Sequence, residues 1–185
     1  MASRTLDVIP TEVDWGGNGD TLIFNAWSRG EQQLFRLTLS SGAIAPITSG
    51  NIVIRESEID ARRNLMVYVE SAASRFSDIY ISNVSGSDAH RLTNANRELS
   101  QRTTLQDVER LRYPAADDLT VEGFFMKPDG WQAGKTYPMI LYIHGGPGGM
   151  WDAGFYHDFQ TLTARGWAVL FINPRGSIAP ARVVG

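Results

Sequence analysis

Short runs of branched and aromatic residues alternate with turn residues over the first hundred positions of the chain. The runs have the period-two spacing of strands, and clusters of Gly, Ser, Asn and Asp separate them. This pattern predicts four strands, at Thr21 to Ala26, Gln33 to Leu39, Leu65 to Glu70 and Asp78 to Val84. Most of this region should therefore be β-sheet.

The strand pattern also repeats after 45 residues without a gap. Shifting the sequence by this distance places Leu22 on Val67 and Phe24 on Val69, and most other matched pairs keep their apolar character. A period of about 40 to 50 residues with four short strands per unit is typical of β-propeller blades. The alternative is one irregular antiparallel sheet whose two hairpins resemble each other by chance.

The pattern changes after Ala95. Residues 96–106 are polar and without periodicity, which predicts a connection between two domains. Val108 to Tyr113 and Val121 to Met126 are two further strand candidates.

Two continuous apolar runs of five follow, at Met139 to Ile143 and Ala168 to Ile172. Such runs are typical of strands buried on both faces. A helix should lie between them, because apolar residues recur there at i, i+4 and i+7 before a glycine that would end it. These positions are Phe155, Phe159, Leu162 and Gly166. Together they predict a βαβ unit.

Composition narrows the class of protein. The chain has 185 residues, 43% apolar content and a net charge of −3, which indicates soluble globular material of one domain or two small ones. No apolar run approaches the length of a membrane span, and no apolar segment of a signal peptide follows Arg4, so a cytoplasmic location is slightly favoured. The absence of cysteine excludes disulfides and thiolate metal sites, and the scattered basic residues predict no nucleic-acid partner.

A glycine-rich motif, His144-Gly145-Gly146-Pro147-Gly148, comes directly after the first apolar run. It places bare backbone N–H groups at the carboxyl edge of a sheet, where an α/β-hydrolase stabilises the oxyanion of acyl transfer. The alternative is that these glycines only permit a tight turn between a strand and a helix.

With the repeat before it and Asn173-Pro174-Arg175-Gly176-Ser177 after it, this motif resembles the prolyl oligopeptidase family of serine peptidases, in its acylaminoacyl-peptidase and dipeptidyl-peptidase branch. The resemblance implies a mixed fold of β-propeller-type blades followed by the N-terminal part of an α/β-hydrolase domain. Residues 1–104 would be the last two blades, residues 105–177 the first strands and helix of the hydrolase, and residues 178–185 a divergent tail. The implied activity is serine-type acyl transfer on short peptides, without a cofactor.

The same resemblance assigns roles to single residues. The backbone N–H of Gly146 would be one oxyanion donor, and Gly145 would belong to the oxyanion loop. The family places its general base downstream of the nucleophile, so His144 is expected to shape the loop. The other residues expected to shape it are Pro147, Gly148 and Arg175. For Arg175, a salt bridge at the propeller interface is an equal alternative. The three histidines stand apart in the sequence, which predicts no metal site.

No serine in these 185 residues has glycine two positions away on both sides, so the motif of the nucleophile is missing. The sequence leaves the family pattern at Ile178. An inactive fragment or frameshifted product is therefore expected, which could self-associate through exposed strands. One alternative is a non-catalytic propeller-type binding or assembly module. Another is a small esterase that pairs Ser177 with His144 or His157.

Overall fold

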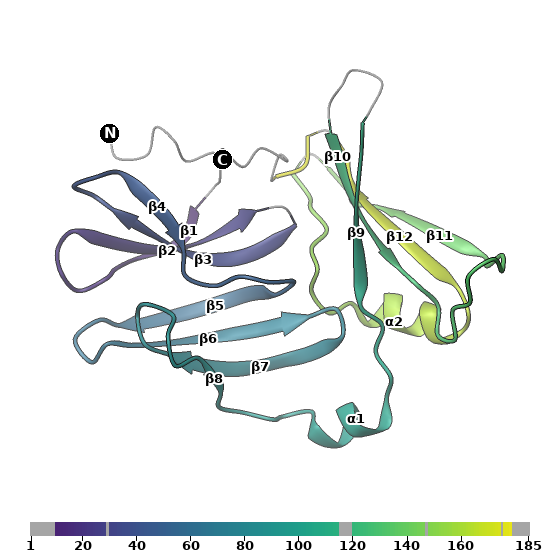
Figure 1. The fold of residues 1–185 in the computed structure, drawn as a ribbon, viewed down its shortest axis with the longest axis horizontal. Coiled ribbons are helices and arrows are strands. Elements are labelled where there is room, and N and C mark those ends of the chain that lie inside the picture. Colours follow the sequence, from purple (N-terminus) through teal and green to yellow (C-terminus); the bar gives the residue numbers. More distant parts are fainter. Residues whose placement is uncertain (1–9, 29, 115–119, 147, 175, 179–185) are drawn as a thin grey trace.

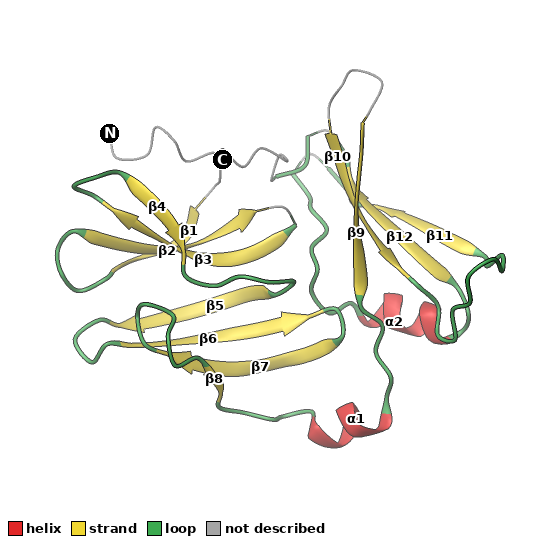
Figure 2. Cartoon of the chain, in the orientation of Figure 1, coloured by secondary structure: helices red, strands yellow, loops and turns green. Residues whose placement is uncertain are grey.

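The computed structural model describes residues 10–28, 30–114, 120–146, 148–174 and 176–178. Strands are the main secondary structure of the described chain, as Figure 2 shows, and they belong to two separate sheets. In Figure 1 the first sheet, β1 to β8, lies beside the second sheet, β9 to β12.

The first sheet consists of two antiparallel groups of four strands, β1 to β4 and β5 to β8. One parallel pair, Gln32 with Val53, joins the two groups. The strands are β1 (Pro10–Trp15), β2 (Thr21–Ser28), β3 (Glu31–Thr38), β4 (Ala43–Pro46), β5 (Val53–Asp60), β6 (Leu65–Ala72), β7 (Arg75–Ser82) and β8 (His90–Arg91).

Apolar side chains fill the space between these two groups. Leu34 of β3 packs with Ile54, Met66 and Tyr68 of the second group, and all four side chains are buried. The buried amide of Asn25 donates through Nδ2 to the carbonyl oxygen of Ile54, 2.9 Å away. The two groups are therefore held together by packing and by a buried hydrogen bond rather than by a continuous ladder.

The four strands predicted in this region are confirmed as β2, β3, β6 and β7. The pattern did not reveal β1, β4, β5 or β8. Strands β4 and β8 are very short and β1 is exposed along its whole length, so burial imposes no alternation on these three. Strand β5 is longer, but its two buried residues are adjacent and do not alternate with exposed ones. The polar segment 96–106 is also not wholly irregular, because it contains the short helix α1 (Arg97–Arg102), which buries no residue.

The second sheet has the strand order β11-β12-β10-β9. Strands β11 and β12 are parallel and the other neighbours are antiparallel. Helix α2 lies between β11 and β12 in the chain, so the predicted strand, helix and strand are confirmed. The elements are β9 (Val108–Pro114), β10 (Thr120–Met126), β11 (Met139–Ile143), α2 (His157–Ala164) and β12 (Ala168–Asn173).

One face of this sheet forms the core of the second part of the chain. Phe124 and Phe171 stack at 5.1 Å between ring centroids, and Phe159 of α2 lies 4.8 Å from Phe171. Helix α2 begins at His157, later than the apolar spacing predicts, and Phe155 packs against Phe76 of the first sheet instead.

The prediction that β11 is buried on both faces is wrong. Met139, Leu141 and Ile143 are between 49% and 59% exposed, while Tyr142 packs onto the core. Strand β11 is the edge of the sheet, and no described element covers its outer face. A run of five apolar residues therefore does not distinguish a central strand from an edge strand with one open face.

Two hairpin turns of the first sheet contact the second part of the chain. Between β2 and β3, the carbonyl oxygen of Gly30 accepts from the N–H of Ala153 at 3.0 Å. Beside it, Glu31 forms an ion pair with Arg110 of β9. Between β6 and β7, the carbonyl oxygen of Ala73 accepts from Nε2 of Gln160 at 2.8 Å.

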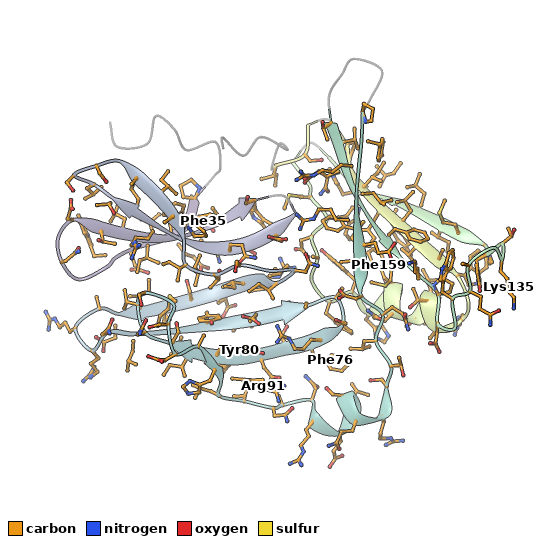
Figure 3. The ribbon with its side chains drawn as sticks, viewed as in Figure 1. Phe35, Phe76, Tyr80, Arg91, Lys135 and Phe159 are labelled. Atoms are coloured by element: carbon orange, nitrogen blue, oxygen red, sulfur yellow. The ribbon has the colours of Figure 1, made fainter. Side chains whose placement is uncertain are left out.

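An aromatic pair reinforces the second of these contacts. Phe76 of β7 and Phe155 lie 4.7 Å apart between ring centroids, and Figure 3 labels Phe76 at this end of the first sheet. Both hairpin turns thus dock through backbone carbonyls, with side-chain contacts beside them.

Within the described residues, no helix has the length and apolar character needed to cross a membrane.

Replacing Gly30 with alanine should weaken the docking of the first hairpin. Gly30 has a φ of +69°, and a Cβ atom there would overlap the ring of Phe124. Gly42 has the same φ of +69° with nothing within 4 Å of such a Cβ, so it is a matched control. Both variants should lose about 1 to 2 kcal/mol from the left-handed backbone. Gly30→Ala should lose about 1 to 3 kcal/mol more from overpacking.

Urea denaturation of both variants measures this difference. Equal losses of unfolding free energy in Gly30→Ala and Gly42→Ala would show that the hairpin does not depend on its contact with Phe124.

Candidate functional site

The two sequence motifs meet at one edge of the second sheet. Strands β11 and β12 are parallel, with Ile143 opposite Ile172. Parallel neighbours end at the same edge, so the segment that follows Ile143 and the segment that follows Asn173 leave the sheet side by side. The N–H of Ile178 donates to the carbonyl oxygen of Gly149 at 3.2 Å, which joins the two segments directly.

The ring of His144 links the two segments a second time. Its Nδ1 lies 2.9 Å from the carbonyl oxygen of Gly145, and its Nε2 lies 2.7 Å from Oγ of Ser177. The Ser177 hydroxyl in turn lies 2.6 Å from the carbonyl oxygen of Pro174. The ring of His144 therefore lies between the two segments and contacts both of them.

The hydrogen-bond directions around His144 depend on its tautomer, because the single hydroxyl hydrogen of Ser177 can point either to the carbonyl oxygen of Pro174 or to Nε2 of His144. The contacts that orient His144 are a carbonyl and a hydroxyl, and no described carboxylate contacts it.

Gly145 and Gly146 have open space in front of them. Neither residue has a positive φ, and a Cβ atom built on either would meet no atom of the described residues within 4 Å. The described turn therefore does not need glycine at these positions, either for its backbone conformation or for its packing. Gly148 is similar, since a Cβ there would lie 3.7 Å from the side chain of Ile178, an ordinary contact.

Gly149 is different, although no sequence motif singles it out. A Cβ atom at Gly149 would lie 2.5 Å from the carbonyl oxygen of Gly145 and 2.5 Å from Nδ1 of His144. The loop therefore folds back on itself at Gly149, which only a glycine allows. Two other predicted loop residues, Pro147 and Arg175, lie outside the described residues.

A buried carboxylate follows the loop. Asp152 is 1% exposed, and its Oδ2 pairs with Nη2 of Arg55, on β5 of the first sheet, at 2.8 Å. Its Oδ1 accepts from the N–H of Gly154 at 2.8 Å and from the hydroxyl of Tyr156 at 2.9 Å. Burial, together with the neighbouring Asp152 charge, raises the pKa of Tyr156, so the phenol keeps its proton and donates.

Sequence reasoning did not identify Asp152. Its only signal is an acidic residue within an apolar and aromatic segment, and the arginine that pairs with it is 97 residues away. The pair joins the segment after the loop to the first sheet.

Asp152→Asn should destabilise the fold by about 2 kcal/mol, because an amide cannot accept from all three donors of this buried site. Asp60→Asn is the control, since Asp60 also pairs with an arginine, Arg63, at 2.5 Å but at an exposed position. Its loss should be too small to measure. Chemical denaturation of the two variants compares them, and equal losses would contradict a special role of the buried carboxylate.

The remaining histidines lie apart from this site. Nε2 of His157, on α2, lies 3.5 Å from Oγ1 of Thr161, and Nδ1 of His90 lies 2.8 Å from the carbonyl oxygen of Asp88. Of the two histidines that could pair with Ser177, the structure therefore brings His144 to it. Across the described ranges, no three His, Asp or Glu side chains are grouped as metal ligands.

Comparison with known proteins supplies the family. No protein-family model matches the chain. An uncharacterized peptidase of Bacillus subtilis, YuxL, is 41% identical over 92 residues, which is 50% of this chain and 14% of the relative. Dipeptidyl-peptidase 5 of Porphyromonas gingivalis is 24% identical over 176 residues, which is 93% of this chain and 25% of the relative. The chain is homologous to peptidases of the prolyl oligopeptidase family.

Solved structures agree in fold. An acylaminoacyl peptidase in complex with Z-Gly-Gly-Phe-chloromethyl ketone superposes with a TM-score of 0.80 at 22% identity, over 97% of this chain and 27% of that chain. An acylaminoacyl peptidase of Pyrococcus horikoshii superposes with a TM-score of 0.79 at 21% identity, over the same shares. The chain thus spans about a quarter, or less, of the length of these relatives.

Proposed function

We propose that the chain carries the oxyanion loop of a serine-type peptidase that cleaves short peptides by acyl transfer. The observation that carries this proposal is the open space at Gly145 and Gly146, at the carboxyl edge of a parallel strand pair. Among the described residues, neither backbone conformation nor packing explains the two glycines. Close approach of a substrate carbonyl to a bare backbone N–H does explain them.

In the proposed mechanism, the N–H of Gly146 donates to the oxygen that becomes negative as a nucleophile attacks the peptide carbonyl. One fixed donor of this kind contributes a factor on the order of 100 to 1000 in rate. Gly145 leaves room for the carbonyl to approach, and His144 holds the loop through Ser177. The proposal assigns no nucleophile, metal or cofactor to these residues.

The same proposal includes the domain organisation. Residues 1–104 would be two β-propeller blades, residues 105–177 the first part of an α/β-hydrolase domain, and residues 178–185 a tail that lies outside the described residues except for Ile178. Support comes from the two groups of four antiparallel strands, which follow the 45-residue repeat of the sequence. Further support comes from the superposition on acylaminoacyl peptidase.

A non-catalytic binding or assembly module is the second candidate. The observation that favours it is the outer face of β11, where Met139, Leu141 and Ile143 are about half exposed at an open sheet edge. An apolar face of this kind next to unpaired backbone groups is suited to self-association.

The third candidate, an esterase, gains support from the contact between Ser177 and His144. However, Oγ of Ser177 also lies 2.6 Å from the carbonyl oxygen of Pro174, which competes for its one hydrogen, and the described contacts of His144 include no carboxylate to orient it as a base. The contact between His144 and Ser177 is therefore better explained as a structural hydrogen bond between the two loop segments.

Binding of a tetrahedral oxyanion tests the first candidate. In ¹H–¹⁵N NMR spectra of the ¹⁵N-glycine-labelled chain, increasing concentrations of phenylphosphonate should shift the amide signal of Gly146 until the shift saturates. The reason is that the anion accepts a hydrogen bond from this amide. Gly134 is the control, since it lies in an exposed loop with nothing within 4 Å of an added Cβ. A Gly146 shift no larger than that of Gly134 would refute an oxyanion donor at this position.

A second experiment addresses the nucleophile. The purified 185-residue chain should not be labelled covalently by a fluorophosphonate probe, since no serine in it has the sequence context of a nucleophile elbow. Any background hydrolysis of p-nitrophenyl acetate should be unchanged in Ser177→Ala. Stoichiometric labelling that disappears in Ser177→Ala would instead establish the esterase.

A further inference from the structure

Asn173 is a polar residue at an inward-facing position of an apolar strand. In β12 the side chains of Val169, Phe171 and Asn173 alternate onto the core face, and Asn173 is 7% exposed. A buried amide has two donor hydrogens and an acceptor oxygen, and leaving them without partners is costly. The contacts of this side chain therefore indicate why asparagine is present.

Both polar atoms of the Asn173 side chain bind one residue of the loop segment. Oδ1 accepts from the backbone N–H of Trp151 at 2.7 Å, and Nδ2 donates to the backbone carbonyl of Trp151 at 2.9 Å. The side-chain amide thus pairs with the backbone of Trp151 as a neighbouring strand would. Because both bonds are made at once, they fix the backbone of Trp151 in position and in direction.

The ring of Trp151 is held by packing. It packs edge-on against Phe171 at 6.2 Å and against Tyr142 at 6.1 Å between ring centroids, and its buried Nε1 has no hydrogen-bond partner among the described residues. Among the described contacts, the hydrogen bonds that hold Trp151 come from Asn173.

Trp151 lies just beyond the loop that presents Gly145 and Gly146. The start of the loop is tied by His144 to Ser177, and its return by Gly149 to Ile178. We propose that Asn173 is a positioning residue that sets the oxyanion loop through the backbone of Trp151. This inference rests on the proposed function, since it assumes that Gly146 is the donor.

The position of the oxyanion loop should affect the rate of catalysis strongly. A misplacement of about 1 Å in a catalytic group can reduce a rate on the order of 100-fold. Asn173 does not contact the reacting atoms in this arrangement. It acts through Trp151. Its substitution should therefore change the position of the loop more than it changes the free energy of unfolding.

Two substitutions separate the bonds made by Asn173. Asn173→Ala removes both, so hydrogen exchange of the Trp151 amide should become about tenfold faster. Asn173→Asp keeps an oxygen that accepts from this N–H but loses the donor to the carbonyl of Trp151, so exchange should be faster than in the unmodified chain and slower than in Asn173→Ala. Asn25→Ala is the control, because it removes another fully buried asparagine, one that binds Ile54 in the first sheet. It should leave the Trp151 amide unchanged.

The phenylphosphonate titration then tests whether Asn173 affects the proposed oxyanion donor, Gly146. In Asn173→Ala the saturable shift of the Gly146 amide should be lost or at least about tenfold weaker, whereas Asn25→Ala should keep it. A full response of Gly146 in Asn173→Ala, or unchanged exchange of its Trp151 amide, would overturn the inference about Asn173. Absence of the response in the unmodified chain would instead refute the proposed oxyanion donor, so the two failures are distinguishable.

Discussion

The parallel pairing of β11 with β12 is the constraint on which the rest of the site depends. It brings the end of each strand to the same edge of the second sheet, although 29 residues separate Ile143 from its partner Ile172. The contacts from His144 to Ser177 and from Ile178 to Gly149 follow from this arrangement. An antiparallel pair would have placed the two strand ends at opposite edges and left the motifs apart.

Buried side-chain amides hold the irregular segments in place. Asn173 pairs with both backbone groups of Trp151, and Gln160 of α2 does the same with Gln106 at 2.8 and 2.9 Å. Gln160 also donates to the carbonyl of Ala73, in the first sheet. An amide is suited to this position because it donates and accepts at once without carrying a charge into the core.

Some of the contacts between the two sheets lie next to the candidate site. The hairpin turn at Gly30 contacts Ala153, and Arg55 of the first sheet pairs with Asp152, both just after the loop. The segment that follows the oxyanion loop therefore lies against the first sheet.

The sequence by itself determined the local elements: strands β2, β3, β6 and β7, the βαβ unit, and the glycine motif at the end of a strand. These depend on side-chain periodicity and on turn residues, which act over a few positions. Only the tertiary structure decided that β11 is an edge strand with Leu141 exposed, that Asp152 pairs with Arg55, and that Asn173 holds Trp151. Burial and pairing of this kind depend on which segments become neighbours in space, and no local pattern records that.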